Sequence, residues 1–153
     1  MKMMDFLHEK AVSVNIKATK KSEVIKELVD LLSQAHPLKE KEKLIKTLLN
    51  RESLGSTGIG QGIGIPHAKS DIVKELIGVL GISKAGVDFD SLDGEPTHIF
   101  ILLVAPEDAA GPHLKALAKI SRMLKDKFVR DSLITAKDAK AVIKIISQED
   151  GKS

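Results

Sequence analysis

His67 is the residue of this sequence best placed to do chemistry, because it follows a glycine-rich segment and a proline. Glycines in that segment alternate with larger residues, at Gly58, Gly60, Gly62 and Gly64. Alternate residues of an extended chain face opposite sides, so one face would carry almost no side chains. Glycine also weakens a strand, which indicates that a backbone, a ligand or a partner approaches closely. Since Pro66 restricts the neighbouring backbone, we predict a flat, extended platform that presents one reactive imidazole.

The segment around His67 resembles the signature of the enzyme IIA domains of the bacterial sugar phosphotransferase system, in the fructose, mannitol and nitrogen-regulatory branch. The matching residues are Arg51-Glu52, Leu54-Gly55-Ser56-Thr57-Gly58-Ile59-Gly60 and Gly62-Ile63-Gly64-Ile65-Pro66-His67. Weaker matches follow at Asp93-Gly94-Glu95-Pro96 and His113-Leu114. The resemblance covers essentially the whole chain. It implies a phosphotransferase component that accepts a phosphoryl group on His67 from the phosphocarrier protein HPr and passes it to a IIB component for sugar uptake.

Such a carrier needs a nucleophile that accepts a phosphoryl group and releases it again. Imidazole is suited to this, because it titrates near neutral pH and a phosphoramidate bond transfers easily. The other residues of the site must orient the ring and neutralise charge on the phosphoryl oxygens. The resemblance assigns the phosphate-facing arginine to Arg51 and a second active-site histidine to His113.

Further donors to the phosphate are predicted at Ser56, Thr57 and Gly58, through hydroxyl groups and backbone amides. His113 is predicted at the second position of a helix that starts at Gly111-Pro112, where unpaired N–H groups and the helix dipole favour an anion. Structural alternatives stay open: Arg51 could end a helix and pair with Glu52, and the serine and threonine could be turn residues.

The remaining histidines, His8, His36 and His98, are interpreted as structural hydrogen-bonding residues, with His98 satisfying a backbone group at the start of a buried strand. A metal site built from His67, His98 and His113 lacks the usual ligand spacing. We therefore expect phosphoryl transfer without a metal or another cofactor. The glycine run is also not a nucleotide-binding loop, because no Gly-Lys-Ser/Thr follows it.

The composition is that of one globular domain over residues 1–153, with 42% hydrophobic and 29% charged residues. The longest apolar run, Ile99–Ala105, is too short to cross a bilayer and no secretory segment is evident, so we expect a cytoplasmic protein without direct membrane insertion. The net charge is +3, but lysines are mixed with acidic residues and Trp and Tyr are absent, which argues against nucleic acid binding.

The chain has no cysteine. Since IIB domains of the resembling family accept phosphate on a cysteine, we expect that acceptor on a separate chain.

The elements that must position these residues follow from hydrophobic spacing. Strands are predicted at Val12–Ile16, at Leu76–Ile82 and at Ile99–Val104, the last apolar on both faces and therefore central in its sheet. Helices are predicted around Val24–Leu32 (capped by Thr19 or Ser22), from Leu44 to near Arg51, from Gly111-Pro112 with glycine as N-cap, and over about 138–147. The pattern indicates a single-domain α/β sandwich, and the resemblance implies a mixed, about five-stranded sheet flanked by helices.

Two functions compete at this level. In one, the chain is a phosphocarrier for fructose- or mannitol-type sugar uptake; in the other, it is a nitrogen-regulatory protein whose phosphorylation state controls binding to regulatory partners. In either case several proteins must reach one imidazole, so we expect a shallow docking face with an apolar rim. Candidate rim residues are Ile59, Ile63 and Ile65.

Overall fold

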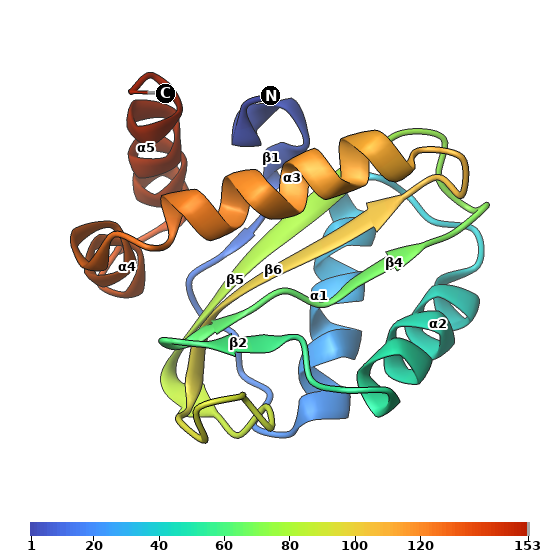
Figure 1. The fold of residues 1–153 in the computed structure, drawn as a ribbon, viewed down its shortest axis with the longest axis horizontal. Coiled ribbons are helices and arrows are strands. Elements are labelled where there is room, and N and C mark those ends of the chain that lie inside the picture. Colours follow the sequence, from blue (N-terminus) through green and yellow to red (C-terminus); the bar gives the residue numbers. More distant parts are fainter. Residues whose placement is uncertain (153) are drawn as a thin grey trace.

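The computed structural model describes residues 1–152, and Figure 1 shows their arrangement. In chain order the elements are a short 3-10 helix η1 (Met3–Asp5), β1 (Leu7–Ser13), α1 (Lys21–Ala35), α2 (Lys41–Ser53), β2 (Gly58–Gly60), β3 (Ile63–Gly64), β4 (His67–Lys69), β5 (Ile77–Val87), β6 (Thr97–Ala105), α3 (Ala110–Met123), α4 (Lys127–Ile134) and α5 (Ala139–Asp150). None of the helices in this part of the chain is long and apolar enough to span a membrane.

The strands form one mixed sheet in the order β1-β5-β6-β3-β2. β4 also pairs with β6, at residues 103–105, after the part of β6 that pairs with β3. The long pair β5–β6 is antiparallel, whereas β1 runs parallel to β5 and both β3 and β4 run parallel to β6. β6 is therefore central, as its apolar sequence predicts. The expected mixed sheet of about five strands is confirmed in a six-stranded form.

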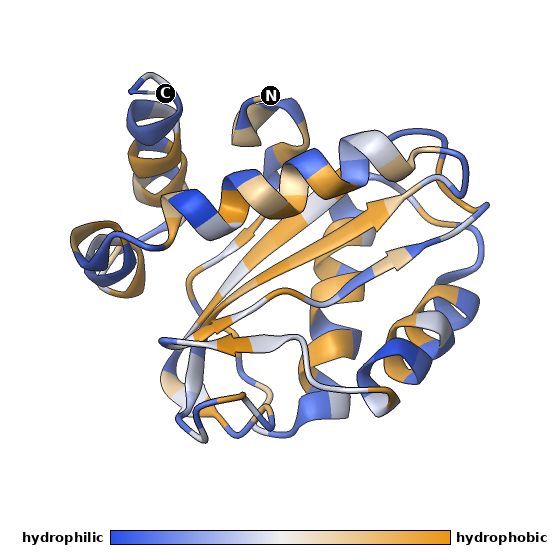
Figure 2. Cartoon of the chain, viewed as in Figure 1, coloured by the Kyte–Doolittle hydropathy of each residue, from blue (hydrophilic) through white to orange (hydrophobic). Residues whose placement is uncertain are grey.

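Helices cover both faces of this sheet (Figure 1). The side chains of β6 alternate between the two faces. Ile99, Ile101 and Leu103 pack with α3, α4 and α5, whereas Phe100, Leu102 and Val104 pack with α1 and α2. The long strands β5 and β6 are accordingly hydrophobic along most of their length (Figure 2). The α/β sandwich predicted from the element order is confirmed.

The prediction of one flat, extended platform is wrong, because the glycine-rich segment folds back on itself. β2 and β3 pair antiparallel. Between them Gly60, Gln61 and Gly62 have positive φ values of 95°, 57° and 78°, which reverse the chain within a few residues. The glycines were predicted to allow a close approach of another group, and at Gly58 that group belongs to the protein itself. A Cβ on Gly58 would lie 2.6 Å from the hydroxyl oxygen of Ser91.

Several predicted boundaries shift. The first strand ends at Ser13, and Ile16 lies beyond it, where its N–H donates to the Ile82 carbonyl at 2.9 Å. α1 is preceded by Lys20 without a side-chain cap, so neither Thr19 nor Ser22 has the predicted role. α3 ends at Met123, and a separate helix, α4, lies between the last two predicted helices.

Candidate functional site

β4 places His67 on the face of the sheet that α3 covers. The strand runs parallel to β6, with His67 opposite Leu103 and Ala68 opposite Val104. Ala68 packs into the core formed with α1 and α2. Because successive side chains of a strand point to opposite faces, the side chains of His67 and Lys69 point to the α3 side.

A hydrogen bond fixes the ring of His67. Its Nδ1 lies 2.7 Å from the backbone carbonyl oxygen of Ile65. A carbonyl oxygen can only accept, so Nδ1 carries the proton and the lone pair of the neutral ring is on Nε2. The side chain is half-buried. The local backbone therefore presents Nε2 as the available nucleophilic atom.

His113 lies against this ring from the first turn of α3. The two ring centroids are 5.4 Å apart at an interplanar angle of 71°, an edge-to-face contact. His113 is buried, and its Nε2 has no hydrogen-bond partner among residues 1–152. A buried polar atom without a hydrogen-bond partner is costly, so it needs an explanation. The sequence-predicted histidine pair is thus brought together by the fold.

The expected helix-start environment of His113 is only partly right. α3 begins at Ala110 rather than at Gly111-Pro112 with glycine as N-cap, so His113 is the fourth helical residue and not the second. Its N–H donates to the Ala109 carbonyl at 3.1 Å and is not free for an anion. The ring, rather than the backbone amide, is the part of His113 that can contribute to the site.

Burial lowers the pKa of His113 below its ordinary value of about 6.5, and the nearby His67 and Lys69 lower it further. The folded chain therefore takes up this proton at a lower pH than the unfolded chain. We expect the free energy of unfolding to be at its full value above about pH 6.5 and to fall as pH decreases below it. For one such group the slope is at most about 1.4 kcal/mol per pH unit.

Urea unfolding of wild type and His113→Gln between about pH 5 and pH 8 measures this contribution. The glutamine variant should lose less stability on acidification than wild type. Parallel pH profiles for the two proteins would contradict a depressed pKa at His113.

Lys69 is a charged residue of this site that the sequence motifs do not single out. It lies two residues after His67 on the same face of β4, its side chain is exposed, and it forms no ion pair with any residue of 1–152. It is close enough to His113 to affect the pKa of that ring. The alternation of strand side chains could have indicated Lys69, had β4 been recognised as a strand.

The other predicted phosphate ligands take part in hydrogen bonds within the fold. Arg51 donates from Nη1 to the Gly55 carbonyl at 2.9 Å, near the end of α2. Ser56 donates from its hydroxyl to the Phe89 carbonyl at 2.7 Å and accepts from the Gly58 N–H at 2.9 Å. These contacts hold the loop between α2 and β2, and they do not join these residues to His67.

Thr57 is buried and is bound by the carboxylate of Glu52. The Thr57 N–H lies 3.1 Å from Glu52 Oε1, and its hydroxyl donates to the same carboxylate. Glu52 pairs with Lys21, whose Nζ lies 2.8 Å from Oε2, and not with Arg51 as one alternative had it. The sequence motif contains Glu52, but its partner on α1 lies too far along the chain for local spacing to reveal it.

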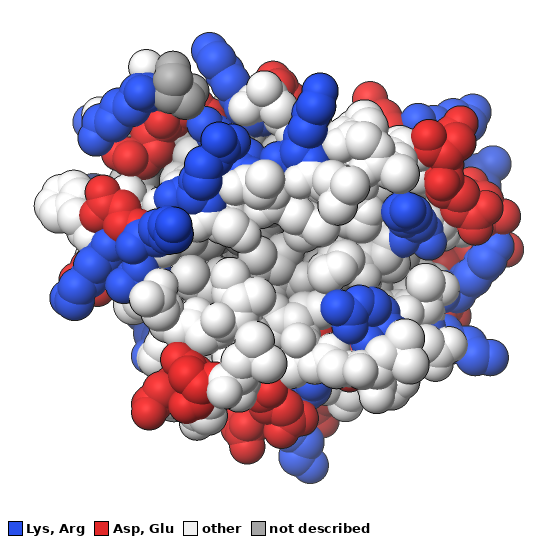
Figure 3. Space-filling view, in the orientation of Figure 1, with Lys and Arg blue, Asp and Glu red and all other residues white. Residues whose placement is uncertain are grey.

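The centre of the face shown in Figure 3 is largely uncharged. Lys and Arg gather over its α3–α4 side, and acidic residues lie along its lower and right edges. Of the three predicted rim residues only Ile59 is on the surface, at 43% exposure. Ile63 and Ile65 are buried in the core between the sheet and α3, because β3 is an inner strand, and their assignment to the rim was wrong.

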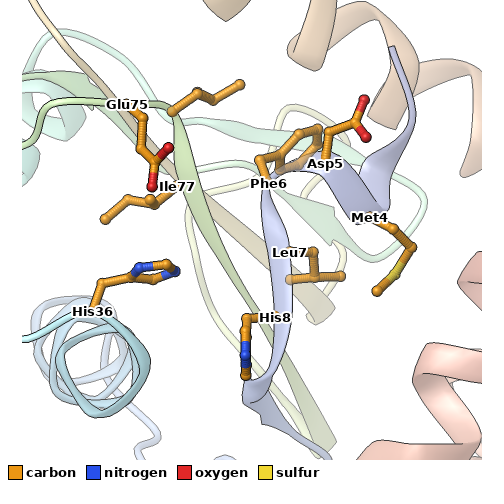
Figure 4. A pocket seen from close by; sticks show the side chains of 9 residues that line it. Met4, Asp5, Phe6, Leu7, His8, His36, Glu75 and Ile77 are labelled. Carbon is orange, nitrogen blue, oxygen red and sulfur yellow. The ribbon is translucent and has the colours of Figure 1, made fainter.

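A second histidine pair lies elsewhere. His8 on β1 and His36 at the end of α1 have ring centroids 6.3 Å apart beside a cavity of about 110 Å3, toward which Glu75 also points (Figure 4). His98 donates from Nδ1 to the Ser83 carbonyl at 2.9 Å, which confirms its predicted role. Among residues 1–152, no group of three or more His, Asp or Glu residues is arranged to hold a metal ion.

Comparison with known proteins relates this geometry to one family. A family model described as "Phosphoenolpyruvate-dependent sugar phosphotransferase system, EIIA 2" matches residues 5–149. The chain is 41% identical over 150 residues to the fructose-specific EIIABC component of Bacillus subtilis, covering 98% of this chain but only 24% of that protein.

Two solved structures extend the comparison. The nitrogen regulatory protein IIA-Ntr of Neisseria meningitidis superposes with a TM-score of 0.85 at 32% identity, covering 93% of this chain and 97% of that one. The enzyme IIA of the Escherichia coli mannitol system, solved in complex with phosphorylated IIB, has a TM-score of 0.78 at 20% identity over 91% of this chain and 95% of that one, which supports the fold.

Proposed function

Because this chain belongs to the EIIA type 2 family of the phosphoenolpyruvate-dependent sugar phosphotransferase system, we propose that it carries a phosphoryl group on Nε2 of His67. The group is taken from phosphorylated HPr and passed to a IIB component, in fructose- or mannitol-type sugar uptake. The observation that carries this proposal is the arrangement of two histidines. The Nδ1 of His67 donates to the Ile65 carbonyl, and its ring contacts the buried ring of His113, whose Nε2 has no hydrogen-bond partner among residues 1–152.

The proposed reaction is an in-line displacement. The Nε2 lone pair of His67 attacks the phosphorus of phosphorylated HPr, the P–N bond to the HPr histidine breaks, and its electron pair returns to that imidazole. The phosphorylated ring of His67 keeps the Nδ1 proton and is cationic, so the Ile65 carbonyl stabilises it. In the second step a thiolate of the IIB component attacks the same phosphorus, and His67 leaves as a neutral imidazole.

Three side chains are proposed to stabilise the phosphoryl oxygens. The ring of His113 adjoins the ring that is phosphorylated, and its Nε2 has no hydrogen-bond partner among residues 1–152. Lys69 supplies a positive charge from the same face of β4. Arg51 uses one of its donors for Gly55 and keeps the others for an anion. Donors preset around a developing charge are the usual means of accelerating phosphoryl transfer.

A regulatory function is the second candidate. It is supported by the 32% sequence identity of this chain to the nitrogen regulatory protein from Neisseria. In this case the phosphorylation state of His67 would control which proteins bind near it, and the exposed hydrophobic side chains of Ile59 and Leu114 are candidate contacts.

Labelled phospho-HPr, followed by candidate IIB proteins, tests both functions. We expect label that is stable in base and lost in mild acid, as for a phosphohistidine and unlike a serine ester, and that moves quickly to a fructose- or mannitol-type IIB. Label that stays on the chain with every IIB, and that changes which proteins the chain captures, would instead support regulation. A chain that takes up no label from phospho-HPr would refute the proposed function.

A further inference from the structure

Glu52 is one of few charged residues buried in this chain, and it has three partners. Its side chain is 4% exposed at the end of α2. Lys21, at the first position of α1, neutralises it at 2.8 Å and also lies 5.0 Å from the centre of the Phe89 ring. The remaining acceptor capacity of the carboxylate goes to the N–H and the hydroxyl of Thr57. A buried carboxylate with this set of partners holds its neighbours firmly, because losing any one leaves a buried charge unsatisfied.

Thr57 connects this carboxylate to the histidine. Its own carbonyl accepts a hydrogen bond from the Ile65 N–H at 2.9 Å. The Ile65 carbonyl in turn accepts the hydrogen bond from Nδ1 of His67 at 2.7 Å. Three successive hydrogen bonds therefore join Glu52 to the imidazole, and the Thr57 and Ile65 backbones are each held at both their N–H and their C=O groups.

We propose that Glu52 is a positioning residue for His67, which sets the direction of the Ile65 carbonyl and thereby the orientation and tautomer of the imidazole. The proposal rests on the phosphoryl-carrier function of His67. The effect is mechanical: the carboxylate fixes Thr57, Thr57 fixes Ile65, and the Ile65 carbonyl keeps the proton on Nδ1. Pro66 helps, because it limits the conformations of Ile65 to extended ones. The lone pair is then on Nε2.

The charge of Glu52 matters to this role as well as its shape. Hydrogen bonds to an ionised carboxylate are shorter and stronger than those to a neutral amide. Glutamine at this position keeps the size of the side chain but weakens both bonds to Thr57 and leaves Lys21 without its closest counter-ion. The next carboxylate, on Asp90, is 3.5 Å from the ammonium and largely exposed.

The test is the tautomer of His67 in unphosphorylated Glu52→Gln, read from the two ring nitrogens in a long-range 1H–15N NMR spectrum. Wild type should have the proton on Nδ1. The variant should show a mixture of both tautomers, because the Ile65 carbonyl is no longer held in place. Transfer from phospho-HPr should slow by something on the order of 10- to 100-fold, the effect of a misplaced reacting group.

A second buried ion pair provides the matched control. Lys119 and Asp150 pair at 3.7 Å with side chains 9% and 4% exposed, and Asp150 also accepts from the Met3 and Met4 N–H groups near the chain termini. Asp150→Asn should lower the free energy of unfolding and leave the His67 tautomer as in wild type. A shift of the tautomer in both variants would mean that it reports general destabilisation, and the proposal would fail.

Two further variants keep the test decisive if Glu52→Gln folds poorly. The double variant Lys21→Met with Glu52→Leu replaces the pair by apolar side chains, which should restore stability relative to the single change while the tautomer stays mixed. Thr57→Val removes the hydroxyl bond alone and should shift the tautomer less. Wild-type tautomers in the folded variants would reduce Glu52 to a stabilising residue. Because the spectrum needs no phosphate, this result stands apart from whether His67 is phosphorylated.

Discussion

Alanine in place of His67 is expected to abolish uptake of label from phospho-HPr, the largest effect of any single substitution. The exposed histidine His8 lies elsewhere, beside the cavity of Figure 4, and His113 is buried, with its Nε2 enclosed by the protein. We therefore expect no other histidine to take the place of His67 as acceptor. The measurement is the amount of acid-labile phosphate on the purified variant after incubation with excess phospho-HPr.

The control for this substitution is His8→Ala, which removes an exposed histidine beside the cavity of Figure 4. It should be labelled as wild type is. His67 is half-buried and its ring makes one hydrogen bond to the protein, so His67→Ala should keep the fold with a change in unfolding free energy of about 1 kcal/mol. Normal labelling of a folded His67→Ala protein would move the phosphorylation site elsewhere.

Phosphorylation should occur at Nε2 and not at Nδ1. The Nδ1 proton is bound to the Ile65 carbonyl, and attack from that nitrogen would break the bond. Coupling between phosphorus and the ring nitrogens of the 15N-labelled phosphoprotein identifies the bonded atom. A phosphorus bond to Nδ1 would show that the imidazole rotates and loses its hydrogen bond to Ile65 before it reacts.

Removal of the His113 ring is expected to slow transfer without stopping it. His113 is proposed to stabilise charge and not to act as the nucleophile, so His113→Ala should lower the rate of transfer by about 10- to 1000-fold, the cost of one lost stabilising donor. His67 should still become labelled when given longer times. Rapid-quench measurement of transfer from phospho-HPr, and then to IIB, gives the two rates separately.

The matched variant for His113 is glutamine, which retains a polar group in the buried position and limits the loss of packing. A partial recovery of the rate in His113→Gln would indicate that a donor toward the phosphoryl group is what matters. Wild-type rates in both steps for His113→Ala would leave His113 as a structural residue of α3, with Lys69 and Arg51 as the remaining charges of the site.

The sequence by itself determined the family and the architecture. Residues 51–67 carry local information, because Pro66 and the spaced glycines restrict the backbone within a few residues, and the resemblance they support is confirmed over residues 5–149. The apolar stripes of α1 and α2 and the doubly apolar β6 follow from periodicity, since burial of each element depends on the pattern of its own side chains. The central place of β6 was predictable for this reason.

Tertiary structure decided how the site is assembled. The glycine segment forms a hairpin because Gly60–Gly62 adopt positive φ values, which composition alone does not distinguish from an extended strand. The contact of His67 with His113 depends on the parallel register of β4 against β6 and on the packing of α3 over that face. The pairing of Glu52 with Lys21 depends on how α1 and α2 pack together. Hydrophobic periodicity encodes which face of an element is buried, but not which distant element covers it, so residues far apart in the chain acquire their partners only when the elements pack.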